Sequence, residues 1–368
     1  MPRWLYYLMI LAIVAPILEL AGGARLELAI FIASALSLMP LAAVIARTTG
    51  NLAYYVGPIA GGLLNATFGN APELIIGIFA VQAGLISVVK ASIAGSIIGN
   101  VLLVLGTSLA VGGLRWGKQY FSNRDAGQYS VMLVLAVASL LIPFAGTFAI
   151  AKQARIQSIS VAVAVVLLVV YALYLSMHVF HLRAHRRGHD SRKEEKELEA
   201  AASTLTVEQE RQPAKASKLW QTLLLLLIAT IGTAWNSELL VGAIKPVTEQ
   251  IGWSQVFIGL VIIPIIGNAA EHSSAVYIAF KDRVDLSMAI AAGSSIQVAT
   301  FVAPLLVLIS LFFATPLDLI FQPIELVIMG MAAILFMLIS LDGESSWLSG
   351  VQLVALYLIA CIVFFFIP

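Results

Sequence analysis

The sequence predicts an all-α membrane protein that crosses the bilayer many times. Of its 368 residues, 60% are hydrophobic and only 11% are charged, whereas soluble domains carry about 25% charged residues. Apolar runs of roughly 20 residues, the length that crosses about 30 Å of hydrocarbon, recur along the whole chain. The single cysteine, Cys361, excludes a disulfide framework and a thiolate metal site.

About eleven apolar segments are long enough to be transmembrane helices. The first could also be a signal peptide, but it lacks a small-residue cleavage site and ends in Glu19, so we assign it as a helix. Two segments, 52–87 and 252–281, exceed a simple span and must be tilted, extended beyond the membrane or broken. The predicted helices are 4–20, 25–47, 52–87, 89–115, 127–147, 156–181, 218–241, 252–281, 285–313, 318–340 and 347–367.

The distribution of basic residues predicts the orientation in the membrane. If the long polar segment 182–217 is cytosolic, alternation of the spans places 16 of the 21 Lys and Arg on the cytosolic side and 5 outside. Cytoplasmic loops of membrane proteins carry such an excess. We therefore expect the N-terminus in the cytoplasm and the C-terminus outside, in a prokaryotic plasma membrane.

A short polar motif occurs twice in the chain. Its copies are Gly69-Asn70-Ala71-Pro72-Glu73 and Gly267-Asn268-Ala269-Ala270-Glu271, and Ala94-Gly95-Ser96 returns at the same offset of 198 residues as Ala292-Gly293-Ser294. Because the copies lie five predicted helices apart, they should cross the membrane in opposite directions, as in the inverted repeats of secondary transporters. The expected organisation is an extra N-terminal helix (1–24), a first five-helix repeat (25–181), a cytosolic linker with acidic and basic runs (182–217) and a second five-helix repeat (218–368).

Glu73 and Glu271 fall near the centres of the two longest apolar segments. A charged group there costs roughly 2.5–3.5 kcal/mol even on insertion scales, so it is kept only where it faces a partner, a cavity or an ion. Asn70 and Asn268 stand three residues earlier and share a helix face with the glutamates. A buried packing pair is the alternative for either copy alone, but two copies favour function.

The expected ligands are all oxygen atoms. Gly69 and Gly267 weaken the helix, which frees carbonyl groups to face a cavity, and the neighbouring helices add Ser96, Ser294, Asn100 and Gln297. Such hard ligands suit Ca2+, with Mn2+ as the alternative. When the cation leaves, two carboxylates in a low-dielectric site would take up protons, so the residues themselves predict competition between a divalent cation and H+.

Three further residues have weaker signals. His272 points about 100° away from Glu271 along a helix, which places it in a supporting shell or a proton relay rather than among the ligands. Glu238, near an outer helix end, is either an interfacial anchor or part of the outward pathway. Glu325 is expected to be a snorkelling surface group.

The two motifs resemble a known family. The stretch from Gly61 to Ile76 is similar to the first α-repeat of the Ca2+/H+ antiporter (CAX) branch of the Ca2+/cation antiporter superfamily. The second copy, from Gly267 to His272, resembles the second repeat, and Gly293-Ser294-Ser295-Ile296-Gln297 resembles the helix that follows it.

The resemblance implies that Glu73 and Glu271 bind Ca2+ together with the carbonyl groups of Gly69 and Gly267. It also implies that the second and seventh helices slide during alternating access, and that Glu238 is the acidic residue on the moving helix. One departure is Gly50-Asn51, where family members usually have an acidic pair. The resemblance therefore implies no carboxylate at this position that would attract a cation or proton on the cytosolic side.

We therefore expect a secondary antiporter that exchanges cytosolic Ca2+ for H+. Na+/Ca2+ exchange and Mn2+/H+ exchange are the alternatives within transport, and a cation channel is the alternative outside it. The motifs HExxH and GxSxG are absent from the sequence, so no enzyme activity is expected. The expected partners are Ca2+, H+ and the lipid bilayer, with no nucleic acid and no bound cofactor, and homo-oligomerisation stays open.

Overall fold

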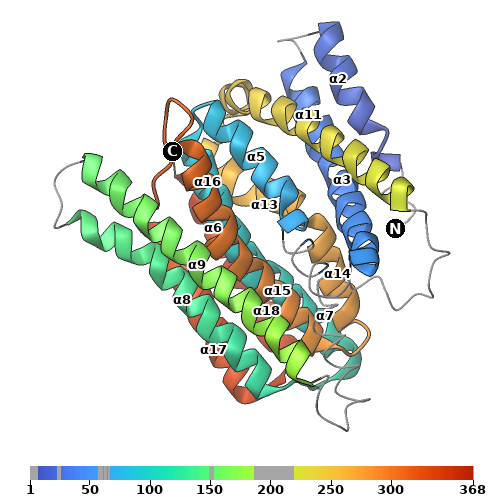
Figure 1. The fold of residues 1–368 in the computed structure, drawn as a ribbon, viewed down its shortest axis with the longest axis vertical. Helices are drawn as coiled ribbons and strands as arrows, with labels where there is room; N and C mark the ends of the chain where they lie inside the picture. Colours follow the sequence, from blue (N-terminus) through green and yellow to red (C-terminus); the bar gives the residue numbers. More distant parts are fainter. Residues whose placement is uncertain are drawn as a thin grey trace.

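The chain folds into a bundle of long helices, shown in Figure 1. A computed structural model describes residues 7–22, 26–56, 61, 64, 67–148, 153–185 and 219–367. Among the described residues, eight helices are long and apolar enough to cross a membrane, and one bent helix pair could form a ninth span. The prediction of an all-α fold rich in apolar spans is confirmed, whereas the count of eleven spans stays a prediction.

The first half of the chain contains one long interrupted helix and several simple ones. Its elements are α2 (Leu11–Gly22), α3 (Glu27–Val56), α5 (Ala71–Gln82), α6 (Ile86–Ile98), the π-helical turn η2 (Gly99–Val104), α7 (Leu105–Trp116), the short strand β1 (Gln119–Tyr120), α8 (Asn123–Thr147) and α9 (Gln153–His185).

The second half repeats much of this order. Its elements are α11 (Leu219–Ile251), α12 (Gln255–Phe257), η4 (Ile258–Ile262), α13 (Ile263–Gly267), α14 (Ala269–Ala279), α15 (Val284–Gln297), η5 (Val298–Val302), α16 (Ala303–Ser310), α17 (Pro323–Asp342), the short strand β2 (Glu344–Ser345) and α18 (Trp347–Phe366). Helices α5 and α14 begin 198 residues apart, as do α6 and α15, which is the offset of the sequence motif.

Both segments that were too long for simple spans contain a turn, at Gly69 and Asn70 in the first and at Asn268 in the second. Within 252–281, helices α13 and α14 meet at an angle of 62°. In 52–87, the first residues belong to α3, which continues to Val56, and α5 begins only at Ala71. The predicted end of the second helix at residue 47 is therefore wrong, because the helix extends past the exposed Arg47 with Thr48 and Thr49 buried.

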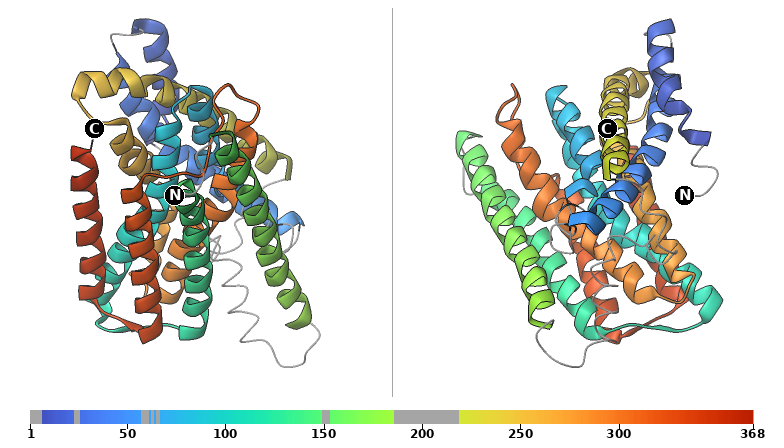
Figure 2. Two further views of the ribbon diagram at one scale, coloured as in Figure 1. Left: turned by 90° about the vertical axis from the view of Figure 1, so that its left-hand side faces the viewer. Right: turned by 45° about the vertical axis from the view of Figure 1, so that its right-hand side comes forward.

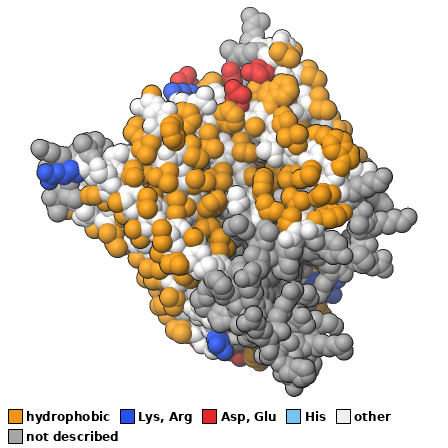
Figure 3. Space-filling view, viewed as in Figure 1, with side chains coloured by type: hydrophobic (Ala, Val, Ile, Leu, Met, Phe, Trp, Pro, Cys, Tyr) orange, Lys and Arg blue, Asp and Glu red, His pale blue; other side chains and the backbone are white. Residues whose placement is uncertain are grey.

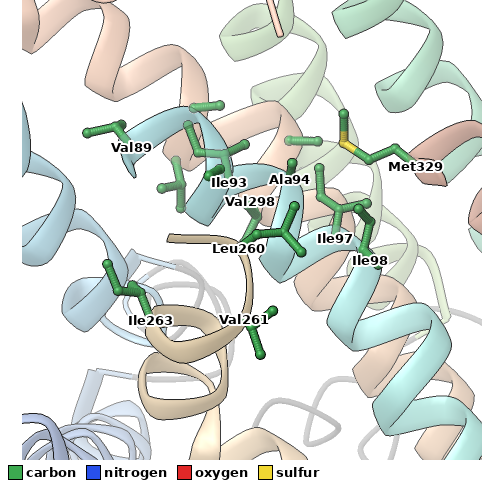
Figure 4. Packing of buried hydrophobic residues seen from close by; sticks show 14 of the residues in the cluster. Val89, Ile93, Ala94, Ile97, Ile98, Leu260, Val261, Ile263, Val298 and Met329 are labelled. Atoms are coloured by element: carbon green, nitrogen blue, oxygen red, sulfur yellow. The ribbon is translucent and has the colours of Figure 1, made fainter. Parts of the chain in front are cut away.

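Helices α2, α3 and α11 pack together as a layer beside the remaining helices, as the right-hand view of Figure 2 shows. The main hydrophobic core includes residues of α3 and α11 as well as of the other helices, and within it α6 packs on η4. Figure 4 shows Ala94 and Ile97 of α6 around Leu260 of η4, and all three side chains are fully buried. On the outside, hydrophobic side chains predominate over the described part of the face in Figure 3, and charged groups lie near its edges. This surface suits a lipid environment.

Candidate cation site

Each motif forms a turn at which an asparagine precedes a helix. Asn70, before α5, has φ −95° and ψ 14°, and Asn268, between α13 and α14, has φ −91° and ψ 9°. Both lie in the sparsely populated bridge region of backbone conformation. Glu73 and Glu271 then fall in the first turns of α5 and α14, where the positive end of the helix dipole favours negative charge.

Amide side chains connect the two halves of the chain. The Nδ2 of Asn70 donates to Oε1 of Gln297 (2.7 Å), and the Nδ2 of Asn268 donates to Oγ of Ser96 (3.1 Å). All four residues are buried. Each motif therefore contacts the helix that follows the other motif, which brings the predicted ligands of both halves into one cluster.

The two carboxylates are held within this cluster. A Cβ atom built on Gly267 would lie 3.2 Å from Oε1 of Glu73, so the side chain of Glu73 reaches the backbone beside the second motif. The Ser294 hydroxyl lies close to the Glu271 carboxylate. The two carboxylates are near enough to repel each other electrostatically.

Three buried oxygen atoms of the cluster have no hydrogen-bond partner among the residues that the structure describes. They are Oε2 of Glu73, Oε2 of Glu271 and Oδ1 of Asn268. Buried polar atoms are rarely left unpaired, so these three oxygens are available to bind a cation or a water. Within the described ranges, no group of three or more His, Cys, Asp or Glu side chains could hold a metal ion. Any cation here would therefore depend on amide, hydroxyl and carbonyl oxygens besides the two carboxylates.

His272 is joined to Glu271 through two intervening side chains. Its Nε2 lies 3.2 Å from Oδ1 of Asn100, and the Nδ2 of Asn100 donates to Oγ of Ser294 (2.9 Å). The hydroxyl of Ser294 in turn lies beside the Glu271 carboxylate. The role of His272, in a supporting shell or in a proton relay, stays a prediction.

Two hollows adjoin the cluster. A small one of about 10 Å³ is lined by Glu73, Ser92, Ser96 and Pro264 among others, which is about the space of a single water molecule. A larger open one of about 600 Å³ lies between α7 and α14 and has His272 at its wall. We call the second hollow the α7–α14 groove. Its lining residues are Leu103, Val104, Thr107, Val111, His272, Ser273, Val276, Tyr277 and Phe280.

The two glycines of the motifs lie within the cluster, whereas Glu238 lies apart from it. Gly69 lies in the turn before α5, and Gly267 is the last residue of α13. Glu238 is an exposed residue of α11, and no hydrogen bond or ion pair between described residues joins it to the cluster. The sequence patterns did not indicate Ser92 or the carbonyl group of Pro264, which accepts a hydrogen bond from Asn268 at 3.1 Å. Ser92 could have been found, because it stands four residues before Ser96 on one helix face.

Comparison with known proteins places this geometry in a family. The family model described as sodium/calcium exchanger protein matches residues 26–180 and 221–366, one region in each half. A protein of Synechocystis named Ca(2+)/H(+) antiporter is 44% identical over 346 residues, which cover 93% of this chain and 92% of that protein. The chain belongs to the Ca2+/H+ antiporter branch of the sodium/calcium exchanger family. The family prediction made from the two glutamate motifs is thus confirmed.

Other members of the family agree with this assignment. The Bacillus subtilis protein named Ca(2+)/H(+) antiporter ChaA is 42% identical over 338 residues, covering 91% of this chain and 92% of that protein. The solved structure of native YfkE superposes with a TM-score of 0.80 at 36% identity and covers 98% of this chain and all of the other. Family membership and the apolar spans together make this chain an integral membrane protein.

Proposed function

We propose that this protein is an antiporter that exchanges Ca2+ for H+ across its membrane. The observation that carries the proposal is the set of three buried, unpartnered oxygens of Glu73, Glu271 and Asn268 at two helix interruptions. The Ca2+/H+ antiporter names of the relatives support the same assignment.

Charge balance explains why the two ions would exclude one another. Two carboxylates neutralise one divalent cation, and oxygen ligands suit Ca2+. Without the cation, the carboxylates repel each other in a poorly solvated site, and protonation relieves both the repulsion and the desolvation cost. Each proton that binds removes a ligand charge from Ca2+, so the same oxygens would carry either ion.

The other predicted residues complete the coordination. Asn70, Ser96, Ser294 and Gln297 would supply or orient oxygens, and the carbonyl groups of Gly69 and Gly267 would face the ion. We assign His272 and Asn100 to the support of Glu271, because their hydrogen bonds lead to it through Ser294. Glu238 would serve the outward pathway from its exposed position on α11.

Transport requires that the site open to each side in turn. We propose that the two halves are inverted repeats and that alternating access moves Ca2+ out of the cytoplasm. The common 198-residue offset of α5 with α14 and of α6 with α15 supports the repeat. The excess of basic residues supports a cytoplasmic N-terminus and an outer C-terminus in a prokaryotic plasma membrane.

Ca2+ uptake into everted membrane vesicles tests the proposal. An imposed pH gradient, acid inside and without Na+, should drive uptake that stops when a protonophore removes the gradient. Membranes with a variant carrying both Glu73→Gln and Glu271→Gln are the control. A requirement for a Na+ gradient would instead indicate Na+/Ca2+ exchange, and Ca2+ flux that persists without counter-flow of H+ would indicate a channel. Competition by Mn2+ would measure the preference between the two cations.

A further inference from the structure

The α7–α14 groove is unusual among the hollows near the cation site because it is open and almost entirely apolar. One wall carries Leu103, Thr107 and Val111, and the other carries Val276, Tyr277 and Phe280. With about 600 Å³ of space, it has the size of a ligand pocket. A hydrated cation gains nothing from such walls, whereas a hydrocarbon chain does.

Two cations lie at the end of the groove, each held on an aromatic ring that lines it. The guanidinium carbon of Arg115 is 3.8 Å from the ring centroid of Phe280, and Nζ of Lys281 is 5.5 Å from that of Tyr277. Cation–π contacts of this kind fix a charge over a ring without neutralising it. The Trp116 indole donates to the Phe280 carbonyl at 3.1 Å, which ties the ends of α7 and α14 together.

Neither cation is paired with a carboxylate among the residues that the structure describes. The acidic groups nearby have other partners, because Glu344 binds Lys118 at 2.6 Å and Asp282 accepts from Gln119 at 3.1 Å. The hydrogen bond to Glu344 also raises the pKa of Lys118. Arg115 and Lys281 therefore form an exposed positive pair at the entrance of an apolar groove.

We propose that the α7–α14 groove binds an anionic phospholipid, with its phosphate at Arg115 and Lys281 and an acyl chain along the apolar walls. Basic pockets between membrane helices are known to recognise anionic headgroups. Arg presents a fork of donors that matches phosphate oxygens, and Lys adds a point charge.

The dimensions of the groove fit one lipid leaflet. From Val111 to Leu103 the wall runs about 12 Å along the helix at 1.5 Å per residue, which is somewhat less than half of a hydrocarbon core of about 30 Å. Trp116 and Tyr277 are about half exposed, at the level where aromatic residues mark the boundary between membrane and water. The headgroup would therefore lie at the interface and the chain would point toward the bilayer centre.

The deep end of the groove reaches His272, which is hydrogen bonded to Asn100 beside the cation site. A bound acyl chain would exclude water from this wall. If the proposed exchange activity holds, on which this step rests, transport should depend on anionic lipid. The lipid site itself does not require that the protein exchange any ion.

Native mass spectrometry of the full-length protein in detergent tests the site directly. The protein is titrated with phosphatidylglycerol or with phosphatidylcholine of the same acyl chains, and bound lipids are counted. We expect a preference for phosphatidylglycerol that the double substitution Arg115→Gln and Lys281→Gln weakens about twenty-five-fold, at about fivefold for each cation near the membrane surface. The matched control Lys118→Gln with Arg124→Gln removes the same charge from the same loop region and should leave the preference unchanged.

A second variant tests the apolar walls independently of the charges. Val276→Trp narrows the groove while leaving Arg115 and Lys281 in place, and it should weaken the binding of phosphatidylglycerol, even where the double charge variant fails to fold. Inorganic phosphate should not displace the lipid, because it lacks the chain. The site would be refuted if the double charge variant or Val276→Trp bound phosphatidylglycerol as tightly as the wild-type protein. It would also be refuted if the control variant lost as much phosphatidylglycerol binding as the double charge variant.

Displacement by phosphate alone would also refute the site. The site would also be refuted if phosphatidylglycerol bound only after four linker glutamates were replaced by Gln. That result would mean that Arg115 and Lys281 bind the acidic linker instead of a lipid. The four residues are Glu194, Glu195, Glu197 and Glu199. If the lipid binds but exchange is absent in every lipid mixture, the proposed antiport fails and the lipid site stands.

Discussion

At the scale of single residues, each buried amide at the centre of the site has a partner in the opposite half of the chain. Asn70 binds Gln297, Asn268 binds Ser96 and Asn100 binds Ser294. In each of these bonds the NH2 group is the donor. An amide NH2 group cannot coordinate a cation, whereas the amide oxygen can. The oxygens of the two glutamates are thereby left available, because the amides are already oriented by partners other than the carboxylates.

Replacing either Glu73 or Glu271 by Gln should abolish Ca2+ exchange without unfolding the protein. The amide keeps the shape of the side chain but cannot carry the negative charge or the proton. Burial of a charge costs roughly 2.5–3.5 kcal/mol on insertion scales, so the unfolding temperature in detergent should stay equal or rise. Glu249→Gln, at an exposed position of α11, is the control that should exchange normally. Exchange retained in either site variant would contradict the assignment.

Asn100→Leu should destabilise the protein because it leaves the His272 Nε2 and the Ser294 hydroxyl without their partner. Leaving a buried polar group unpaired costs about 1–3 kcal/mol. A double-mutant cycle with Ser294→Ala, followed by denaturation in detergent, should give a coupling free energy of about 0.5–1.5 kcal/mol. Strictly additive effects would show that the hydrogen bond between Asn100 and Ser294 contributes nothing.

At the scale of helices, α6 and η4 approach closely enough that their backbones touch. A Cβ atom on Gly95 would overlap the carbonyl group of Leu260, and one on Gly259 would lie 2.7 Å from the carbonyl oxygen of Val88. Small residues allow such close packing between membrane helices. The contact anchors the helix that carries Ser96 against the segment that leads to Asn268.

The repeat-related glycines Gly95 and Gly293 should therefore respond differently to the same substitution. Gly95→Ala should destabilise the protein by about 1–3 kcal/mol, because two backbones must separate to accept the methyl group. Gly293→Ala meets no atom within 4 Å, and Ala favours a helix over Gly by about 1 kcal/mol. Thermal unfolding of both variants in one detergent provides the comparison, and an equal loss of stability would show that the packing of α6 on η4 is not tight.

At the scale of the whole molecule, sequence patterns predicted what depends on polarity and spacing. The apolar runs predicted an all-α membrane protein, and the recurrent Gly-Asn-Ala motif predicted the shared cluster and the family. The apolar runs have the length and hydropathy of membrane spans. The motif places carboxylates and amides inside such spans, where polar groups are usually functional. Helix ends were less predictable, since α3 and α11 continue to Val56 and Ile251, beyond the end of their apolar stretches.

Side-chain environment could not be predicted where it depends on distant segments. Glu325 was expected at the surface, but only 1% of it is exposed, and it forms a capping box with Gln322 at the start of α17. The pairing of Asn70 with Gln297 likewise depends on how two helices 227 residues apart meet. Hydropathy and spacing carry no information about such contacts.

Apparent Ca2+ affinity should fall as the pH is lowered. Protons added to the two carboxylates remove the charge that holds the cation, so the affinity should change about tenfold per pH unit for each proton released on binding. Calorimetric titration with Ca2+ at several pH values in detergent, together with the count of protons released, measures both quantities. The doubly substituted Glu73→Gln and Glu271→Gln protein should bind no Ca2+ at any pH. An affinity that is independent of pH would separate Ca2+ binding from protonation.

Strands β1 and β2 pair antiparallel, with Gln119 opposite Ser345 and Tyr120 opposite Glu344, and so fasten a loop of the first half to a loop of the second. Together with the amide contacts across the site, this strand pairing means that each half of the chain stabilises the position of the other. A gene split within codons 186–218 should therefore still yield a working protein from two polypeptides made in the same cell. An affinity tag on one fragment should recover its untagged mate from membranes, and recovery of the tagged fragment alone would mean that the covalent tether is indispensable for assembly.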